Sequence, residues 1–396
     1  MKNKSTNMYK KIILTLATTT VLMGACIKDR TSSPDIATVK VPYTSLTTTT
    51  NYFTTFKGPD SATSVDFSGQ TTRINMLKEI DAYVKSFATA PLSSSKLKGM
   101  FENTGNQFSS ADLNSATDKT IVSKTAQSFS AAEADFERNT FRGYFDSVAA
   151  VSAFAAQTAT QGVPGKLGTY LVNGKGFEYA QFIQKGLIGA MQLDQISNIY
   201  LGTEKMAADN STIVSGKNYT QLEHHWDEAY GYLTSNEYFP KQDPADNTKW
   251  LETFLGTYVR QVNGNLGDPT AIYMSFIKGR AAIVNNDVNV RDAEIASIRT
   301  SLEKAIATIA ISYLNKTKTA TTDAARMHAL SEGVGFVYSL RYAFNPKINR
   351  AKSNELLSIL MDKPNGFWSL TNADIDNVRN QIATTFSISS EAIVNH

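Results

Sequence analysis

The sequence predicts an all-α protein, a helical bundle preceded by a short irregular or β-containing segment. Beyond Gly69, apolar residues recur every three or four positions in one stretch after another, as they do on the buried face of an amphipathic helix. Strong two-residue alternation, which marks half-buried strands, is missing throughout. Turn residues (Gly, Asn, Asp and Pro) separate the periodic stretches, which is typical of long helices joined by turns.

Residues 1–25 have the character of a signal segment. "MKNKSTNMYKK" carries four lysines and no acid, and the apolar run "IILTLATTTVLMGA" follows it. This run is shorter than the ~20 apolar residues of a membrane span, so it predicts a secretory signal. The small residues before the cysteine in "VLMGAC" resemble a bacterial lipobox, which implies that Cys26 is lipidated and tethers the protein to a membrane. The alternative is an ordinary signal followed by a chance cysteine.

Charge and cysteine content exclude several classes of function. Four of the 39 basic residues and none of the 36 acidic residues lie in the signal, so its removal lowers the formal net charge from +3 to −1. We therefore expect no nucleic-acid partner, because such a protein needs a basic face to neutralise phosphates. Cys26 is the only cysteine, so lipidation leaves no thiol for a disulfide, a zinc site or a nucleophile.

Residues 26–68 are predicted to form a tether between the lipid and the folded body. This stretch is dominated by Thr and Ser and shows little helical periodicity. Two β-branched pieces, "IATVKV" at 36–41 and "ATSVDF" at 62–67, are able to pair as a small hairpin.

Residues 69–396 are predicted to form one all-helical domain. Ser130 followed by Glu133 three residues later is a capping-box signature and predicts a helix start. The stretch at 176–201 is apolar nearly all round and contains two glycines, so we expect a central, buried helix there. The predicted helical stretches are 71–87, 130–154, 176–201, 247–262, 268–286, 291–316, 322–344 and 354–362.

Two further patterns concern the organisation of this domain. The long glycine-rich loop at 160–176 is expected simply to cross the end of the bundle, and the alternative is that it borders a ligand. "FIQKGLIGA" at Phe182 and "FIKGRAAI" at Phe276 both place Phe-Ile shortly before Lys-Gly, an echo that indicates two related half-bundles.

The stretch "QLEHHWDEAYGYL" at 221–233 holds two of the four histidines. At 100° per residue, His225, Glu228 and Tyr232 share one half-buried edge of the helix, whereas His224 points away from the core. The bland interpretation is a satisfied histidine at the edge of the core. The core stripe of this helix is predicted to be Leu222, Trp226, Ala229 and Leu233.

A second candidate group lies in "ARMHALSEGVGFVYSL" at 325–340. His328, Glu332, Gly335 and Ser339 form a polar, small stripe, and His328 and Glu332 lie one turn apart. Each of two helices thus offers a histidine with a glutamate one turn away, the pattern by which a bundle holds a metal between facing helices. The alternative is a buried His328–Glu332 hydrogen bond that fixes helix packing, with Gly335 admitting a neighbour.

Two imidazoles and two carboxylates suit zinc or iron, with open positions left for water. The sequence therefore predicts a metal site made of His225, Glu228, His328 and Glu332, with Tyr232 and Ser339 as lining. The spacing differs from the H-E-x-x-H motif of metalloproteases, in which both histidines lie on one helix.

Several stretches together resemble a lipoprotein family of Bacteroidota that is described as a domain of unknown function and is related to imelysin and iron-regulated proteins. The resemblance covers about Tyr43 to Lys347 and implies an imelysin-like helical bundle in two related halves. It also implies an outer-membrane lipoprotein linked with iron or haem acquisition. The stretches are "SGQTTRINMLKEIDAYV", "GKGFEYAQFIQKGLIGAMQLDQI", "EHHWDEAYGY", "FIKGRAAI", "HALSEG" and "LRYAFNPK".

Imelysin-type proteins carry a G-x-H-x-x-E signature, and His225 and Glu228 match its H-x-x-E part. Glu223 stands where that signature has glycine, which is a departure from the family pattern. The peptidase label attached to imelysins does not carry over, because no recognised zinc-protease motif is found in this sequence.

We therefore expect a lipid-anchored protein of the bacterial cell envelope, in the outer membrane, that binds iron, another metal or an iron-containing ligand. An outer-membrane transporter is the expected partner. One alternative is a metal-dependent hydrolase or peptidase with Glu228 or Glu332 as general base. Another is a scaffold or partner-binding lipoprotein without metal, in which the histidines are structural.

Overall fold

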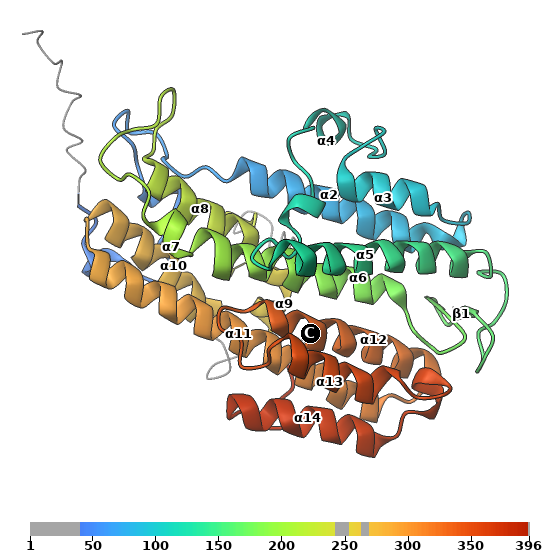
Figure 1. Cartoon of the computed structure of the whole chain (residues 1–396). Coiled ribbons are helices and arrows are strands. Elements are labelled where there is room, and N and C mark those ends of the chain that lie inside the picture. Colours follow the sequence, from blue (N-terminus) through green and yellow to red (C-terminus); the bar gives the residue numbers. More distant parts are fainter. Residues whose placement is uncertain (1–39, 242–252, 263–268, 395–396) are drawn as a thin grey trace, which may run out of the picture. The chain divides into compact units, whose positions relative to one another are not determined.

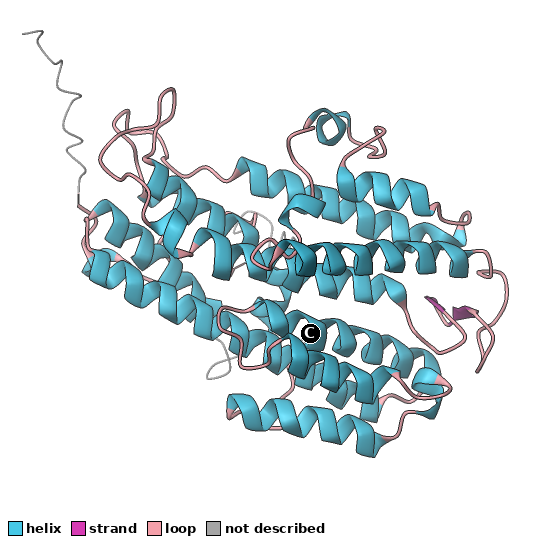
Figure 2. Ribbon diagram, in the orientation of Figure 1, coloured by secondary structure: helices cyan, strands magenta, loops and turns pink. Residues whose placement is uncertain are grey.

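Helices form most of the structure, and the all-α prediction is confirmed. The computed structural model describes residues 40–241, 253–262 and 269–394, which are drawn in colour in Figure 1. Within these ranges, the one sheet is a two-stranded antiparallel hairpin (Figure 2). No helix in the described ranges is both long and apolar enough to cross a membrane.

The long helices coincide with the stretches in which apolar residues recur at helical spacing. The α-helices are α1 (Tyr52–Thr55), α2 (Ser68–Lys85), α3 (Ser94–Glu102), α4 (Ala111–Ser115), α5 (Ala131–Ser152), α6 (Tyr179–Leu187), α7 (Thr203–Met206), α8 (Gln221–Leu233), α9 (Leu255–Gln261), α10 (Pro269–Val284), α11 (Val288–Thr319), α12 (Asp323–Ser339), α13 (Arg350–Met361) and α14 (Asn372–Phe386). Short 3₁₀ turns are Tyr43–Ser45, Ser86–Ala88, Val122–Lys124, Leu340–Tyr342 and Gly366–Ser369.

Helix starts follow the capping residues. The predicted capping box at the start of α5 is confirmed, with Ser130 and Glu133 each bonding to the other's backbone. Thr220 and Glu223 form a second box at the start of α8, which fixes where the histidine-bearing helix begins. The helix predicted at 247–262 is seen as α9, and its residues 247–252 lie outside the described ranges.

The central helix continues past α6 in a wider form. Ile188–Leu193 and Gln195–Tyr200 are π-helical, so the chain from Tyr179 to Tyr200 is one buried helical run, as predicted for 176–201. Gly189 lies in this wide part, where a Cβ atom would come within 2.4 Å of the Ser339 hydroxyl oxygen. The glycine therefore allows α12 to pack directly against the π-helical turn.

The hairpin forms at a different place from the one predicted. Strands β1 (Gly165–Leu167) and β2 (Tyr170–Val172) pair within the glycine-rich loop, with Leu167 opposite Tyr170. The predicted pairing of 36–41 with 62–67 is wrong for its second piece, since that piece makes only a single bridge, Lys57 with Thr63. Most of the first piece lies outside the described ranges.

The packed body begins earlier than residue 69. Tyr52 and Phe56 are fully buried, and the Tyr52 hydroxyl donates to Asp227 at 2.7 Å. At the start of the described chain, Val41 exchanges two hydrogen bonds with the side chain of Asn285 in the α10–α11 turn. The predicted tether is thus fastened to the body from Val41 onward, because its aromatic residues have a core to join.

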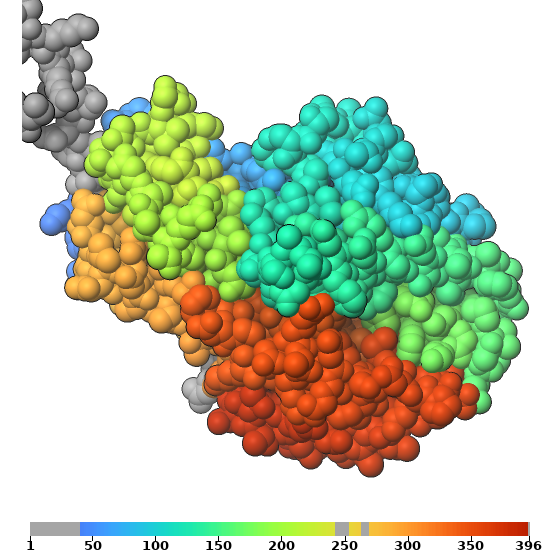
Figure 3. Space-filling view, viewed as in Figure 1, coloured from blue at the N-terminus to red at the C-terminus, as the bar shows by residue number. Residues whose placement is uncertain are grey.

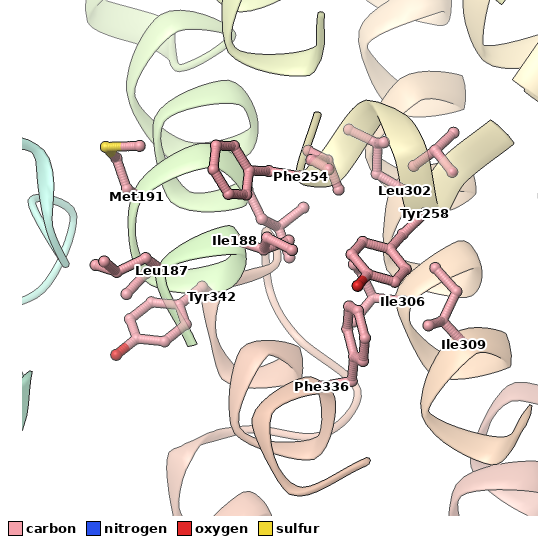
Figure 4. Packing of buried hydrophobic residues seen from close by; sticks show 14 of the residues in the cluster. Leu187, Ile188, Met191, Phe254, Tyr258, Leu302, Ile306, Ile309, Phe336 and Tyr342 are labelled. Carbon is pink, nitrogen blue, oxygen red and sulfur yellow. The ribbon is translucent and has the colours of Figure 1, made fainter. Parts of the chain in front are cut away.

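The core lies where the central helix meets α9, α11 and α12. Figure 4 shows Ile188 of the π-helical turn, Tyr258 of α9, Ile306 of α11 and Phe336 of α12 converging on one buried cluster. The rings of Tyr258 and Phe336 pack edge to face, with centroids 4.8 Å apart. This packing fixes α9 and α12 beside each other, next to the cavity described below.

Candidate functional site

The first predicted pair, on α8, is present as a hydrogen bond. His225 Nδ1 lies 3.0 Å from Glu228 Oε2, and the His225 side chain is 12% exposed. The other carboxylate oxygen, Oε1, accepts from the Gln70 amide at 2.9 Å and from the Tyr200 hydroxyl at 3.1 Å. Both oxygens of Glu228 are therefore occupied by donors from α2, α8 and the π-helical run.

The charge of Glu228 follows from these donors. Burial by itself raises the pKa of a carboxyl group, but the bond from His225 and the nearby His224 lower it more. The pKa of Glu228 therefore lies below its ordinary value, and the group stays ionised at neutral pH. This closed arrangement matches the bland interpretation of a satisfied histidine at the edge of the core.

Two neighbours of this pair differ from their predicted positions. Tyr232 is fully buried, and the ring of Tyr200 lies 5.8 Å from it and 6.2 Å from the ring of His225. Tyr200 thus takes the place predicted for Tyr232 beside the histidine. His224 is only partly exposed, because its ring stacks on Tyr219 at 4.5 Å.

The second predicted pair, on α12, includes a third residue. His328 Nε2 lies 3.4 Å from Glu332 Oε2, and Nδ1 lies 2.6 Å from Glu178 Oε2, just before α6. The ring of Tyr170, on β2, stacks on the imidazole with centroids 4.0 Å apart. His328 therefore joins α12, the start of α6 and the hairpin.

His328 contacts two carboxylates through its two ring nitrogens. Nδ1 makes a hydrogen bond with Glu178, and Nε2 approaches Glu332 to 3.4 Å. The carboxylates lie against different ring nitrogens, so they do not converge on one point as metal ligands do.

Glu332 is also half of a buried ion pair. Lys185 Nζ of α6 lies 2.9 Å from Glu332 Oε1, with the two side chains 3% and 8% exposed. Burial by itself raises the pKa of Glu332, but Lys185 and His328 lower it by more. The pKa of Glu332 therefore lies below its ordinary value. The pair is thus an ionised contact between two central helices.

Ser339 and Gly335 fix the packing of α12 on α6. The Ser339 hydroxyl is fully buried, donates to the Lys185 carbonyl at 2.6 Å and accepts from Gly189 N at 3.1 Å. A Cβ atom at Gly335 would lie 2.4 Å from Cβ of Lys185. Gly335 does admit a neighbour, and Ser339 has a packing role here rather than the predicted lining role.

A cavity of about 750 Å³ lies beside His328. Its walls come from α2, the hairpin, α6, α9 and α12, and His328 and Glu332 are both in the wall. We call it the hairpin cavity, because Lys166 and Gly168 to Leu171 of the hairpin border it. The sequence predicts that the glycine-rich loop simply crosses the end of the bundle, but its place in the wall favours the alternative that it borders a ligand-sized space. Figure 3 shows the green segment with the hairpin beside the orange and red C-terminal segment.

The structure brings each histidine to its own glutamate but does not gather the four residues into one group. His225 and Glu228 lie outside the wall of the hairpin cavity. Helix α8 packs mainly on Gln195–Tyr200, α2 and α10, whereas α12 packs mainly on α11, α6 and α13. In Figure 1, α8 and α12 occupy different parts of the bundle. Among the described residues, no group of three or more His, Cys, Asp or Glu is arranged to hold a metal ion.

The sequence did not predict that Glu178, Lys185 and Tyr170 belong to the site. Lys185 is the only charged residue of α6, which is a buried helix, and this is the signal that could have identified it, because a buried charge requires a partner. Glu178 and Tyr170 contact His328 only through the tertiary fold, and nothing in their local sequence points to it. Cys26, the predicted lipidation site, lies outside the described ranges.

Comparison with known proteins gives one match. A family model described as a domain of unknown function (DUF4856) matches residues 52–389, which includes α1 through α14. No curated protein and no solved structure matches the chain.

Proposed function

We propose that this chain, which belongs to the family described as a domain of unknown function (DUF4856), binds a small organic ligand at the bacterial cell envelope. The hairpin cavity is the observation that carries the proposal. Its volume of about 750 Å³ falls within the range of small-molecule sites, roughly 300–1,000 Å³. Such sites combine apolar walls with convergent polar groups. The wall of this cavity is mixed, with apolar residues such as Leu171 and Phe254 and charged residues such as Lys185, His328 and Glu332.

The amino-terminal sequence supports the envelope location. A basic start, an apolar run and the "VLMGAC" segment favour a lipidated Cys26 and an outer-membrane lipoprotein. The described chain begins beside the α10–α11 turn, where Val41 is held by Asn285. In Figure 1 this point lies at the left and the hairpin lies at the right.

The resemblance to imelysin and iron-regulated proteins supports a role in nutrient acquisition beside an outer-membrane transporter. Iron fits this proposal best as part of an organic ligand. The carboxylates in the cavity wall already bind Lys185 and His328, so a bare ion would have to displace those partners. Iron or zinc held directly by His225, Glu228, His328 and Glu332 is the second candidate, favoured by the close approach within each pair.

The charge of Glu332 favours binding over hydrolysis. A general base works best when its pKa is close to the operating pH. The ion pair with Lys185 holds the pKa of Glu332 below its ordinary value, which stabilises the carboxylate and makes it a weak base. Glu332 is therefore better suited to shape the cavity than to accept a proton.

The test is the binding of a neutral fluorescent probe, N-phenyl-1-naphthylamine, to the purified mature protein. Ala180 lies in the cavity wall on α6, and Ala180→Trp fills the space with an indole ring. Ala296 is an exposed residue of α11 outside the wall, so Ala296→Trp adds the same ring elsewhere and serves as the matched control.

We expect saturable binding of one probe molecule per chain in the parent and in Ala296→Trp. Affinity should fall at least about tenfold in Ala180→Trp, which corresponds to a loss of ~1.4 kcal/mol. Equal binding by all three proteins, or no saturable binding by the parent, would contradict the proposal and favour the scaffold alternative.

A further inference from the structure

In the wall of the hairpin cavity, the carboxylates all have partners, whereas one of the lysines has none among the described residues. Each wall carboxylate already has at least two donors. Asp81 accepts from Lys85 at 2.6 Å and from the Gln184 amide at 2.6 Å. Glu178 accepts from His328 and from the Gln181 amide at 2.8 Å. Little acceptor capacity is left for a positively charged ligand.

The third wall carboxylate, Glu332, also has partners for its oxygens. It binds Lys185 and His328, and the Tyr258 hydroxyl lies 3.4 Å from its Oε1. A cationic ligand would have to replace buried partners of this carboxylate. Such an exchange leaves a buried charge unpaired and is costly.

The cations of the wall exceed its carboxylates. Four lysines (Lys78, Lys85, Lys166 and Lys185) face three carboxylates. The excess is clearest at Lys166 on β1, whose side chain is exposed and forms no hydrogen bond or ion pair with another described residue. The rim of the cavity therefore offers a free ammonium group.

The interior supplies an apolar surface next to this rim. Phe254 and Leu171 are buried residues of the wall, and Val84 and Phe87 line it from the α2 side. An aromatic or aliphatic group placed against these side chains is removed from water and gains about 25 cal/mol per Å² of apolar surface buried.

We propose that the hairpin cavity takes an organic anion, with a carboxylate, sulfonate or phosphate at the Lys166 rim and an apolar body against Phe254. This inference rests on the proposed function, and it adds the chemical class of the ligand. Lys166 acts as the residue that selects for charge, while the apolar wall supplies contacts that do not depend on charge.

The experiment compares two probes of similar shape on the mature protein. 1-Anilinonaphthalene-8-sulfonate carries one negative charge, and N-phenyl-1-naphthylamine lacks the sulfonate. Lys166→Glu reverses the charge at the rim. Lys57→Glu is the matched control, because Lys57 is likewise an exposed lysine in a β-bridge and lies outside the cavity wall.

We expect Lys166→Glu to weaken binding of the sulfonate at least about tenfold and to change binding of the neutral probe less than about twofold. Lys57→Glu should bind both probes as the parent does. Higher ionic strength should weaken binding of the sulfonate probe and leave binding of the neutral probe unchanged, because salt screens a charge at an exposed rim.

Three outcomes are distinguishable. If the sulfonate binds equally well to the parent and to Lys166→Glu while the neutral probe binds both, the anion assignment is overturned and the cavity remains a ligand site. If Lys57→Glu weakens binding of the sulfonate probe as much as Lys166→Glu does, the change in affinity is caused by the net charge of the protein. The anion assignment is then also overturned. If neither probe saturates one site on the parent, the proposed function itself fails.

Discussion

Lys185 and Glu332 form a buried ion pair, with Nζ 2.9 Å from Oε1, at the contact between α6 and α12. The Lys185 ammonium also lies over the ring of Tyr258, 4.9 Å from its centroid. The pair therefore connects two central helices to α9 and forms part of the wall of the hairpin cavity.

Removal of one partner of this pair should destabilise the protein strongly. We expect Lys185→Met and Glu332→Leu each to cost about 3–5 kcal/mol, because each leaves the opposite charge buried without its partner. The double variant replaces both charges with apolar groups and should recover most of the loss. Urea unfolding of the four proteins measures these free energies, and additive losses in the double variant would contradict the account.

The close contact between α10 and Trp226 should make Gly279 sensitive to any side chain. A Cβ atom at Gly279 would lie 2.2 Å from the indole ring of Trp226, which is fully buried. Gly279→Ala should therefore lower the free energy of unfolding by about 1–3 kcal/mol.

Gly143, in the middle of α5, is the control for this substitution. Nothing lies within 4 Å of a Cβ atom placed there. Gly143→Ala should therefore stabilise the protein by up to about 1 kcal/mol, because alanine loses less backbone entropy in a helix. Thermal unfolding separates the two variants, and equal shifts in the same direction would show that contact with Trp226 does not decide the effect.

Asp194 should make stability depend on pH. Burial raises the pKa of this carboxyl group from 3.8 to about 6, although Ser128 and Asn198 donate hydrogen bonds to it. The folded protein therefore keeps this proton at a pH where the unfolded chain has released it. The resulting stability is fully present below about pH 4 and is lost as the pH rises through about 6.

The variant Asp194→Asn isolates this effect. Between pH 4 and 6 the carboxyl group should contribute a fall in the free energy of unfolding of at most about 1.4 kcal/mol per pH unit, and the variant should lack that contribution. Urea unfolding at several pH values measures both slopes. Parallel curves for the parent and the variant would contradict the raised pKa.

The two histidines of the predicted metal site should respond differently to substitution. His328 lines the hairpin cavity and His225 does not, so His328→Ala should weaken the binding of N-phenyl-1-naphthylamine, whereas His225→Ala should leave it within about twofold of the parent. Elemental analysis measures the iron and zinc content of the untagged parent and of both variants. We expect no bound iron or zinc in the parent that disappears in each of the two variants. One metal ion per chain that requires both histidines would support the predicted four-residue site instead.

Much of the fold could be predicted because helices leave local patterns in the sequence, namely the spacing of apolar residues and the capping residues. The spacing of Ile74, Leu77 and Ile80 predicts α2, and Ser130 with Glu133 predicts the start of α5. The hairpin was missed because three-residue strands are too short to show alternation. The early part of the body was missed because Tyr52 and Phe56 are held by tertiary contacts rather than by helical periodicity.

The candidate site could be predicted only in part. One-turn spacing places His328 beside Glu332 and the same helix geometry places His225 near Glu228, so both pairs follow from the sequence. Whether the pairs meet depends on the order in which helices pack, and no periodicity encodes that order. The same holds for Tyr170 and Glu178, which reach His328 from segments more than 140 residues away.

The most direct test of the central claim is the position of N-phenyl-1-naphthylamine in a crystal structure of its complex with the purified protein. The account predicts the probe between the β1–β2 hairpin and α12, against Phe254 and Leu171 and beside the stacked rings of Tyr170 and His328. A probe bound elsewhere on the molecule, with the hairpin cavity empty, would contradict it.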